Sequence, residues 1–365
     1  MSKIVSISTS VPSYRHDQMD ILTFMQRVYA MNEADKRKLK FLYHQSAIDT
    51  RYSVLPDYSL NAGDWQFYPP TENLEPFPNL ETRMIWYNKT APALSVNAIE
   101  KCIGNKISKN KITHLITVSC TGFSAPGLDL QIMEAMNLPV NIFRTSINFM
   151  GCYAAIHALK LANAFCSIDK TANVLIVCTE LCTLHFQREN TVDNVASSLL
   201  FGDGAAAMLI TNDDNEMYGL KINNFYSEVT FRGKKDMSWE LSSSGFLMAL
   251  SAYVPDLIEQ DFNNLMENAL ENAGVNKNDI SHWCIHPGGK RILSSIEKSI
   301  GITADDLQYS YNVLKNYGNM SSPTILFVLK EIMDSLKNSK GNKRNIFGAA
   351  FGPGLTLETF ILSDD

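Results

Sequence analysis

Short apolar segments alternate along the chain with longer segments of helical periodicity. The segments ITHLITVSC (112–120) and ANVLIVCTE (172–180) have the continuous apolar character of buried strands. A helical pattern lies between them at 127–137, and residues 154–165 are apolar on most of the circumference of a helix. This alternation of strands and helices predicts an α/β fold.

Two segments depart from this rhythm. Residues 56–82 hold five of the 13 prolines, which predicts a long surface excursion without helix or strand. The polar segment NDDNEMYG (212–219) separates two strand-like patterns, AAAMLIT before it and GLKINNFYSEV after it. Because few contacts cross a polar divider of this kind, we expect two halves, 1–212 and 213–365.

A faint internal repeat is consistent with this division. Phe201-Gly-Asp-Gly precedes a strand pattern at the end of the first half, and Phe351-Gly-Pro-Gly precedes another at the end of the second. Two FGxG turns in equivalent places suggest a duplicated α/β unit. Chance similarity between glycine-rich turns is the alternative.

Composition narrows the function classes. The 38 acidic and 32 basic residues give a net charge of -6, which argues against a broad nucleic-acid surface. No apolar run reaches the roughly 18 residues that a membrane span needs, and the first 15 residues lack the apolar core of a secretory signal. The seven cysteines are odd in number and scattered, as in reduced proteins, so we expect a cytoplasmic location.

Cys152 is the first candidate for chemistry. It follows a glycine and directly precedes the apolar helix pattern, so we expect it at a buried helix N-terminus. The helix dipole and free N–H groups there favour the thiolate, which is the reactive form of cysteine. The alternative is an inert core cysteine, which is common.

Two further polar residues stand at the ends of predicted elements. His286 ends an apolar strand pattern before a Pro-Gly-Gly turn, and Asn319 precedes a helix that Ser322 and Pro323 would start. Taken singly, each also fits a hydrogen-bonded core histidine or a turn asparagine. The order Cys, His, Asn is also that of papain-like proteases. Those enzymes have a CG[SA]C[WY] motif near the mature N-terminus, whereas 151 residues precede Cys152 here.

Five motifs in a fixed order resemble the chalcone and stilbene synthases, the type III polyketide synthases of the thiolase superfamily. They are GCYAA at Cys152, LLFGDGAAA (199–207), IHPGG (285–289), YGNMSSPT (317–324) and FGPGLTLET (351–359). The resemblance implies a thiolase-like five-layer αβαβα fold from two duplicated halves, usually as a homodimer. It implies that an acyl-CoA starter is extended with malonyl-CoA and released as a cyclised pyrone, resorcinol or phloroglucinol, with no other cofactor.

The resemblance also implies residue roles. Cys152, held as thiolate by His286 and the helix N-terminus, would carry the acyl group. His286 and Asn319 would stabilise the enolate that forms when malonyl-CoA loses carbon dioxide. Gatekeeper and cavity positions would be Phe201, Met248, Cys120, Thr121, Cys182, His185, Trp239 and Ser321. The CoA phosphates would be bound by Lys38, Arg51 and Lys290.

Some of these positions depart from the family pattern. Met248 stands where a second gatekeeper phenylalanine is usual, and Trp239 where a small residue is usual, so the cavity is expected to be narrow. Gln45 and Phe41 replace two expected cations of the CoA site. We expect an aliphatic or simple acyl-CoA starter and a few malonyl extensions.

Three alternatives remain open. A ketoacyl synthase III shares the Cys, His and Asn but condenses onto a carrier protein and normally has other loops around the His and Asn. A degenerate partner subunit would bind acyl chains without reacting. Cys178, Cys182 and His185 have a spacing that can bind zinc, but a fourth ligand is missing, so we expect no metal. His157 is interpreted as a helix-face residue and not as a second base.

Overall fold

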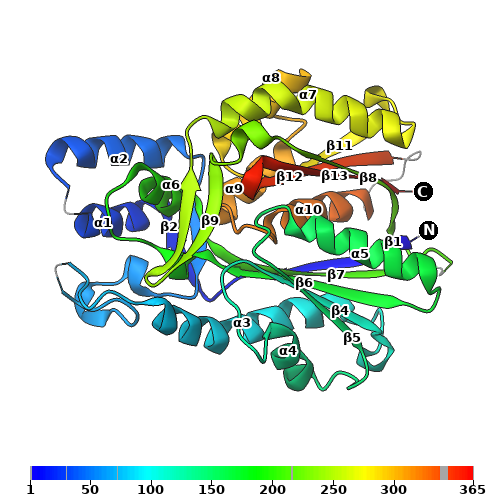
Figure 1. Cartoon of the computed structure of the whole chain (residues 1–365), viewed down its shortest axis with the longest axis horizontal. Helices are drawn as coiled ribbons and strands as arrows, with labels where there is room; N and C mark the ends of the chain where they lie inside the picture. The colour runs from blue at the N-terminus through cyan, green and yellow to red at the C-terminus, as the bar shows by residue number, and fades with distance from the viewer. Residues whose placement is uncertain (1, 30, 72, 215–216, 338–343, 365) are drawn as a thin grey trace.

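A computed structural model describes residues 2–29, 31–71, 73–214, 217–337 and 344–364, in which nine strands form one sheet (Figure 1). Their order is β11-β12-β13-β8-β1-β7-β6-β4-β5. The strands are β1 (Ser2–Ser10), β4 (His114–Ser119), β5 (Phe143–Asn148), β6 (Asn173–Leu181), β7 (Asp203–Asn212), β8 (Leu220–Val229), β11 (Ile280–Ile285), β12 (Arg344–Gly352) and β13 (Thr356–Asp364). Two separate pairs join β2 (Tyr14–Asp17) to β3 (Thr50–Ser53) and β9 (Met237–Ser242) to β10 (Gly245–Leu250).

The helices fill the sequence between these strands. They are α1 (Gln18–Val28), α2 (Glu33–Gln45), α3 (Leu80–Ile103), α4 (Leu128–Met136), α5 (Ala154–Ile168), α6 (Val192–Leu200), α7 (Val254–Ala273), α8 (Lys290–Ile300), α9 (Gln308–Tyr317) and α10 (Thr324–Lys337). In the described part of the chain, no helix is both long and apolar enough to cross a bilayer.

The two halves of the sheet repeat one pairing pattern. In the first half, β1 and β7 are antiparallel, β7 and β6 are antiparallel, and β6 and β4 are parallel. The second half repeats this with β8, β13, β12 and β11. The two FGxG turns accordingly lead into the equivalent strands β7 and β13. The expectation of an α/β fold built from a duplicated unit is confirmed.

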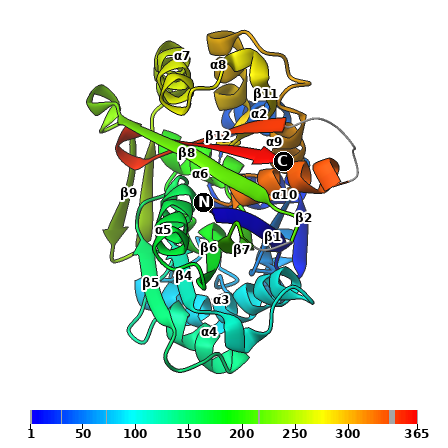
Figure 2. The same cartoon turned by 90° about the vertical axis from the view of Figure 1, so that its right-hand side faces the viewer.

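Five layers follow from this arrangement (Figure 2). Helices α3 and α4 cover the outer face of the first half-sheet, α5 and α10 lie between the half-sheets, and α7 and α8 cover the second. The central layer buries Leu159 of α5 and Ile325 of α10 against Ile116 of β4 and Ile346 of β12. Helices α5 and α10 are apolar on both sides because each contacts a half-sheet on either side, as the pattern at 154–165 predicts.

The segment 56–82 corrects one expectation. Its described residues before Leu80, where α3 begins, contain only two short 3₁₀ turns, as its prolines predict. However, the segment is not a surface excursion throughout, because Asp57, Tyr58 and Tyr68 are buried. The Asp57 carboxylate accepts N–H bonds from Phe67 (3.0 Å) and Tyr68 (2.9 Å), so the loop folds back on itself. Its aromatic side chains pack in the hydrophobic core of the first half.

Candidate active site

Cys152 lies two residues before α5, in a turn that packs against the second FGxG motif. Gly151 has φ +82°, and a Cβ there would lie 2.2 Å from Pro353 Cδ. A Cβ on Gly352 would lie 2.5 Å from Tyr153 Cδ1. Side chains do not fit at either glycine, so the two motifs approach closely and fix the backbone around Cys152.

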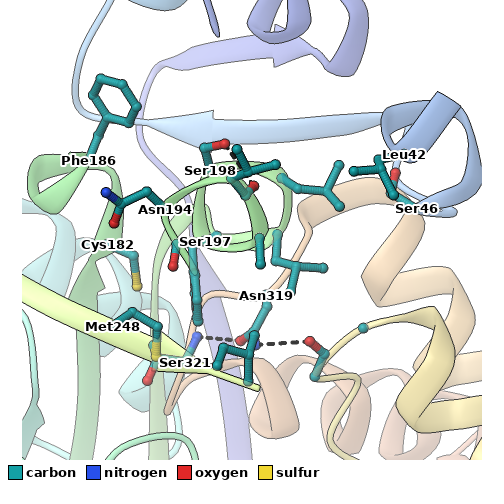
Figure 3. Close-up of a pocket in the computed structure, with 18 of the residues that line it drawn as sticks. Leu42, Ser46, Cys182, Phe186, Asn194, Ser197, Ser198, Met248, Asn319 and Ser321 are labelled. Atoms are coloured by element: carbon teal, nitrogen blue, oxygen red, sulfur yellow. Dashed lines mark hydrogen bonds between the residues drawn. The ribbon is translucent and has the colours of Figure 1, made fainter. Parts of the chain in front are cut away.

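Cys152, His286 and Asn319 line one cavity of about 610 Å³. Figure 3 shows Asn319, Ser321, Met248 and Cys182 in one part of the cavity wall, with Leu42 and Ser46 in another part, at the end of α2. Much of the rest of the wall is aliphatic or aromatic, including residues of α1, α2 and α6. Polar residues also line the cavity, but most of the exposed surface of its wall is apolar, which is typical of a binding site for a largely apolar ligand.

His286 follows β11 directly, as the sequence predicts. Its backbone N–H donates to the carbonyl of Ala349 on β12 (2.8 Å), which continues the strand pairing as far as His286. The side chain is buried, and neither ring nitrogen has a hydrogen-bond partner among the described residues. Burial lowers the pKa of His286 to about 3, so the imidazole is neutral. Unpaired polar atoms on a cavity wall are positioned for a ligand.

The Cys152 thiol is also neutral, which corrects the expectation of a resting thiolate. Burial raises the pKa of Cys152 to about 11, and hydrogen bonding with Ser321 opposes this only in part. Its Sγ lies 4.0 Å from Oδ1 of Asn319. At this position the cost of removing a charge from water exceeds the stabilisation that the N-terminus of α5 provides.

The Asn319 amide is held in one orientation. Its Oδ1 accepts the N–H of Ser321 at 2.8 Å, and its Nδ2 donates to the carbonyl of Gly288 at 3.4 Å (Figure 3). The backbone of Asn319 forms a parallel bridge with Phe201, with Gly202 N–H donating to Asn319 O at 2.9 Å. The first FGxG turn and the asparagine loop therefore form one unit at the cavity wall.

The predicted gatekeeper and cavity residues are brought together. The cavity is lined by Phe201, Met248, Cys120, Thr121, Cys182, His185, Trp239 and Ser321. On the β9–β10 hairpin, Trp239 pairs with Met248, and its Nε1–H donates to the carbonyl of Cys120 at 2.7 Å. His185 stacks on Phe246 with the ring centroids 4.1 Å apart. The hairpin thus supplies an aromatic wall.

The expected CoA residues lie in different environments. Lys38 on α2 and Lys290 at the start of α8 both line the cavity, and the Lys38 side chain is 79% exposed. Arg51 is 3% exposed instead. Its guanidinium donates to Phe201 O at 2.6 Å and to Gln18 Oε1 at 2.9 Å. Its third guanidinium nitrogen, Nη2, is buried without a hydrogen-bond partner among the described residues. With two nitrogens bound to protein atoms, Arg51 is better suited to a structural role than to the phosphate-binding role expected from the sequence.

Sequence reasoning missed Glu180, which is buried at the end of β6 beside the cavity. One carboxylate oxygen accepts the Cys120 N–H and the Thr121 hydroxyl, both at 2.8 Å, and the other accepts the Ser322 hydroxyl at 2.7 Å. Burial raises the pKa of Glu180 to about 7. The sequence did contain a signal, because Glu180 ends an otherwise apolar strand pattern. A carboxylate is costly to bury without partners, so a glutamate at that position predicts a set of hydrogen-bond donors around it.

The candidate zinc residues form no metal site. Within the described ranges, no three His, Cys, Asp or Glu side chains are arranged to hold a metal ion. The ring of His185 is occupied: Nε2–H donates to Thr121 O at 2.6 Å and Nδ1 accepts the Phe246 N–H at 3.2 Å. His157 lies on α5 with Nε2 3.0 Å from Glu358, and it does not line the cavity.

Comparison with known proteins agrees with this geometry. The family profile for "Chalcone and stilbene synthases, N-terminal domain" matches residues 1–214, and the profile for the C-terminal domain matches residues 225–364. "Type III polyketide synthase C" of Arabidopsis thaliana is 28% identical over 98% of this chain and 94% of its own length. "Probable polyketide synthase 1" of Dictyostelium discoideum is 28% identical over the whole chain, which spans only 11% of that relative.

The fold is shared with a solved structure. The crystal structure of PKS-I from the brown alga Ectocarpus siliculosus superposes with a TM-score of 0.93, at 25% identity, covering 100% of this chain and 98% of the other. The family profiles over both halves, a relative matched over nearly its whole length and the shared fold lead to the same conclusion. The chain belongs to the chalcone and stilbene synthase family and is a type III polyketide synthase, an acyltransferase-type condensing enzyme.

Proposed function

We propose that Cys152 takes the acyl group from a starter acyl-CoA and holds it as a thioester. The observation that supports this most strongly is that Cys152, His286 and Asn319, from three separate segments, line one cavity. Because the thiol is neutral, its proton must leave as sulfur attacks the carbonyl carbon. The unpaired His286 ring accepts that proton and returns it to the departing CoA sulfur, so CoA leaves as the thiol.

His286 also serves the extender step, here together with Asn319. Malonyl-CoA places its thioester oxygen against N–H groups of His286 and Asn319, which stabilise the enolate as carbon dioxide leaves. The enolate carbon attacks the Cys152 thioester, a carbon–carbon bond forms, and the bond to Cys152 sulfur breaks. The released thiolate then takes a proton from water. A neutral His286 suits this step, because it keeps one N–H to donate.

We propose an aliphatic or simple acyl starter, a few extensions and a pyrone, resorcinol or phloroglucinol product. The largely apolar cavity supports the starter class. The wall formed by Trp239, Phe246 and His185 supports a short product, because these three rings pack in contact and limit the space beside Cys120.

Three further expectations stay proposals. A homodimer is supported by β5, the last strand of the sheet, where Phe143 is 70% exposed and Val140, just before it, is 97% exposed. Unpaired strand edges with exposed apolar side chains favour association with a second copy. A cytoplasmic location is supported by seven cysteines that are all free thiols. The division at residues 212 and 213 is supported by the change of half-sheet between β7 and β8.

Mass spectrometry tests the function. Purified protein receives malonyl-CoA with a panel of short, long and aromatic acyl-CoAs, in parallel with Cys152→Ala. We expect new polyketides from aliphatic starters and none from the variant. Acylated Cys152 without product would indicate an extender on a carrier protein, as in a ketoacyl synthase III, and absence of acylation would indicate a non-catalytic subunit.

A further inference from the structure

The C-terminal end of α6 is held by donors from outside the helix. A helix leaves its last carbonyl groups without internal partners. Here four successive carbonyls each accept a bond from a different element: Ser198 from Tyr43 Oη (3.2 Å), Leu199 from Gln18 Nε2 (3.0 Å), Leu200 from Asn319 N (2.9 Å) and Phe201 from Arg51 Nη1 (2.6 Å).

These bonds matter because the apolar side chains of α6 are only partly buried: Val195 and Leu199 pack against the core of the first half, and Leu200 packs against the core of the second. Of its nine residues, only Ser198 is buried, and most of the helix lines the cavity. The hydrogen bonds at its C-terminal end therefore add to this partial packing in setting the position of α6. Phe201 follows the helix directly, so the position of its backbone is set by the same bonds.

Arg51 connects these contacts. Its Nε donates to Gln18 Oε1 at 2.9 Å while Nη1 donates to Phe201 O, so it orders both the amide that holds Leu199 and the carbonyl of Phe201. Gly318 makes room for it, because a Cβ on Gly318 would lie 2.9 Å from Arg51 Cδ. A cation at the C-terminal end of a helix is also favoured by the helix dipole.

We propose that Arg51, with Gln18, is a positioning residue for decarboxylation of malonyl-CoA. Arg51 fixes the Phe201 backbone, Phe201 and Gly202 pair with the backbone of Asn319, and the Asn319 amide faces the extender. This inference rests on the role proposed above for Asn319. It replaces the phosphate-binding role that the sequence suggested for Arg51.

A positioning role and a phosphate-binding role for Arg51 predict different kinetics. Arg51→Lys keeps the charge but cannot make both bonds of the guanidinium fork. If Arg51 positions Asn319, kcat for malonyl-CoA decarboxylation falls by about 10 to 100-fold, since small displacements of catalytic groups have effects of that size, while KM stays within about threefold. Acylation of Cys152 by a starter stays near the wild-type rate. If Arg51 binds phosphate, KM rises for both CoA substrates and kcat is unchanged, which would overturn the inference.

Decarboxylation is measured as the conversion of malonyl-CoA to acetyl-CoA. Acylation of Cys152 is measured by intact-protein mass spectrometry. Arg15→Lys is the matched control, because Arg15 is exposed on β2 and pairs only with nearby Asp17 among the described residues. Gln18→Leu is a milder second variant, expected to lower decarboxylation in the same pattern. Wild-type protein that does not decarboxylate malonyl-CoA would contradict the proposed function itself.

A rescue experiment separates positioning from general stability. Arg51 lines the cavity, so a small cation can reach the space left in Arg51→Ala. We expect millimolar guanidinium to restore part of the decarboxylation rate and tetramethylammonium, which has no N–H donors, to restore none. A variant that unfolds more easily would gain nothing from guanidinium, so equal failure of both ions would contradict a positioning role.

Discussion

The indole N–H of Trp239 donates a 2.7 Å hydrogen bond to the carbonyl oxygen of Cys120. This bond ties the β9–β10 hairpin to the end of β4 and closes one side of the cavity. Trp239→Gly should open that side and give polyketides with at least one more malonyl unit. Trp239→Phe keeps a ring and should keep product length, with a stability loss of about 1 kcal/mol for the missing bond. Product length is measured by mass spectrometry. Products from Trp239→Gly identical to those of the wild type would show that Trp239 does not limit product length.

Replacement of Asn319 by aspartate tests the oriented amide. The oxygen that accepts the Ser321 N–H would be kept, but the nitrogen that faces Gly288 O would become a second acceptor. We expect decarboxylation of malonyl-CoA to fall by about 10² to 10³-fold, as on loss of an oxyanion donor. Acylation of Cys152 should persist. A variant that loses acylation and decarboxylation equally would show that Asn319 acts on the starter step as well.

Replacement of Gly151 by alanine tests the contact between the two halves at Cys152. The new Cβ would lie 2.2 Å from Pro353 Cδ, on a backbone with φ +82°. We expect a loss of about 2 kcal/mol or more in the free energy of unfolding and slower acylation of Cys152. Gly63→Ala is the control, because its Cβ would meet no atom within 4 Å. Equal unfolding curves for the two variants would contradict the close contact.

The reactivity of Cys152 should depend steeply on pH. With burial raising its pKa to about 11, the thiolate fraction rises about tenfold per pH unit between pH 7 and 9. Alkylation of Cys152 by iodoacetamide, measured by intact-protein mass spectrometry, should follow that slope. A rate that is already constant at neutral pH, and that loses this behaviour in His286→Ala, would instead indicate a thiolate paired with His286.

Glu180 should make stability decrease with pH. Burial raises its pKa from 4.5 to about 7, so the unfolded chain loses this proton first as the pH rises. As the pH rises from 4.5 to 7, this titration lowers the free energy of unfolding by about 3 kcal/mol. Above pH 7 it lowers the free energy of unfolding no further. Urea unfolding at pH 5 and pH 8 should show this change in wild type and not in Glu180→Gln. The same pH response in both proteins would assign the effect to other groups.

The sequence predicted the parts of the site that lie at the ends of regular elements. Cys152, His286 and Asn319 follow or precede strongly patterned segments, so their placement could be inferred before the fold was known. Arg51 could not be placed in this way. Its partners Gln18 and Phe201 are 33 and 150 residues away, and their contacts turn what looked like a surface cation into a buried one.

Two other misses have the same origin. The tyrosines of residues 56–82 are buried because Asp57 satisfies the backbone of the loop, which prolines alone do not indicate. The thiolate at Cys152 was expected because the helix dipole stabilises a negative charge. The free-energy cost of burying that charge is larger than this stabilisation. Local patterns show where a polar group stands in an element, whereas its charge state depends on which distant segments cover it.

In the part of the chain that the structure describes, the β9–β10 hairpin pairs with no strand of the nine-stranded sheet, which has a consequence for how new products can arise. It contributes Trp239 and Met248 to the cavity but none of the three residues proposed to carry the chemistry. Substitutions in the hairpin can therefore accumulate with little effect on the sheet that supports Cys152 and His286. In a lineage of such enzymes, product diversity can evolve in this ribbon while the condensing chemistry is inherited unchanged.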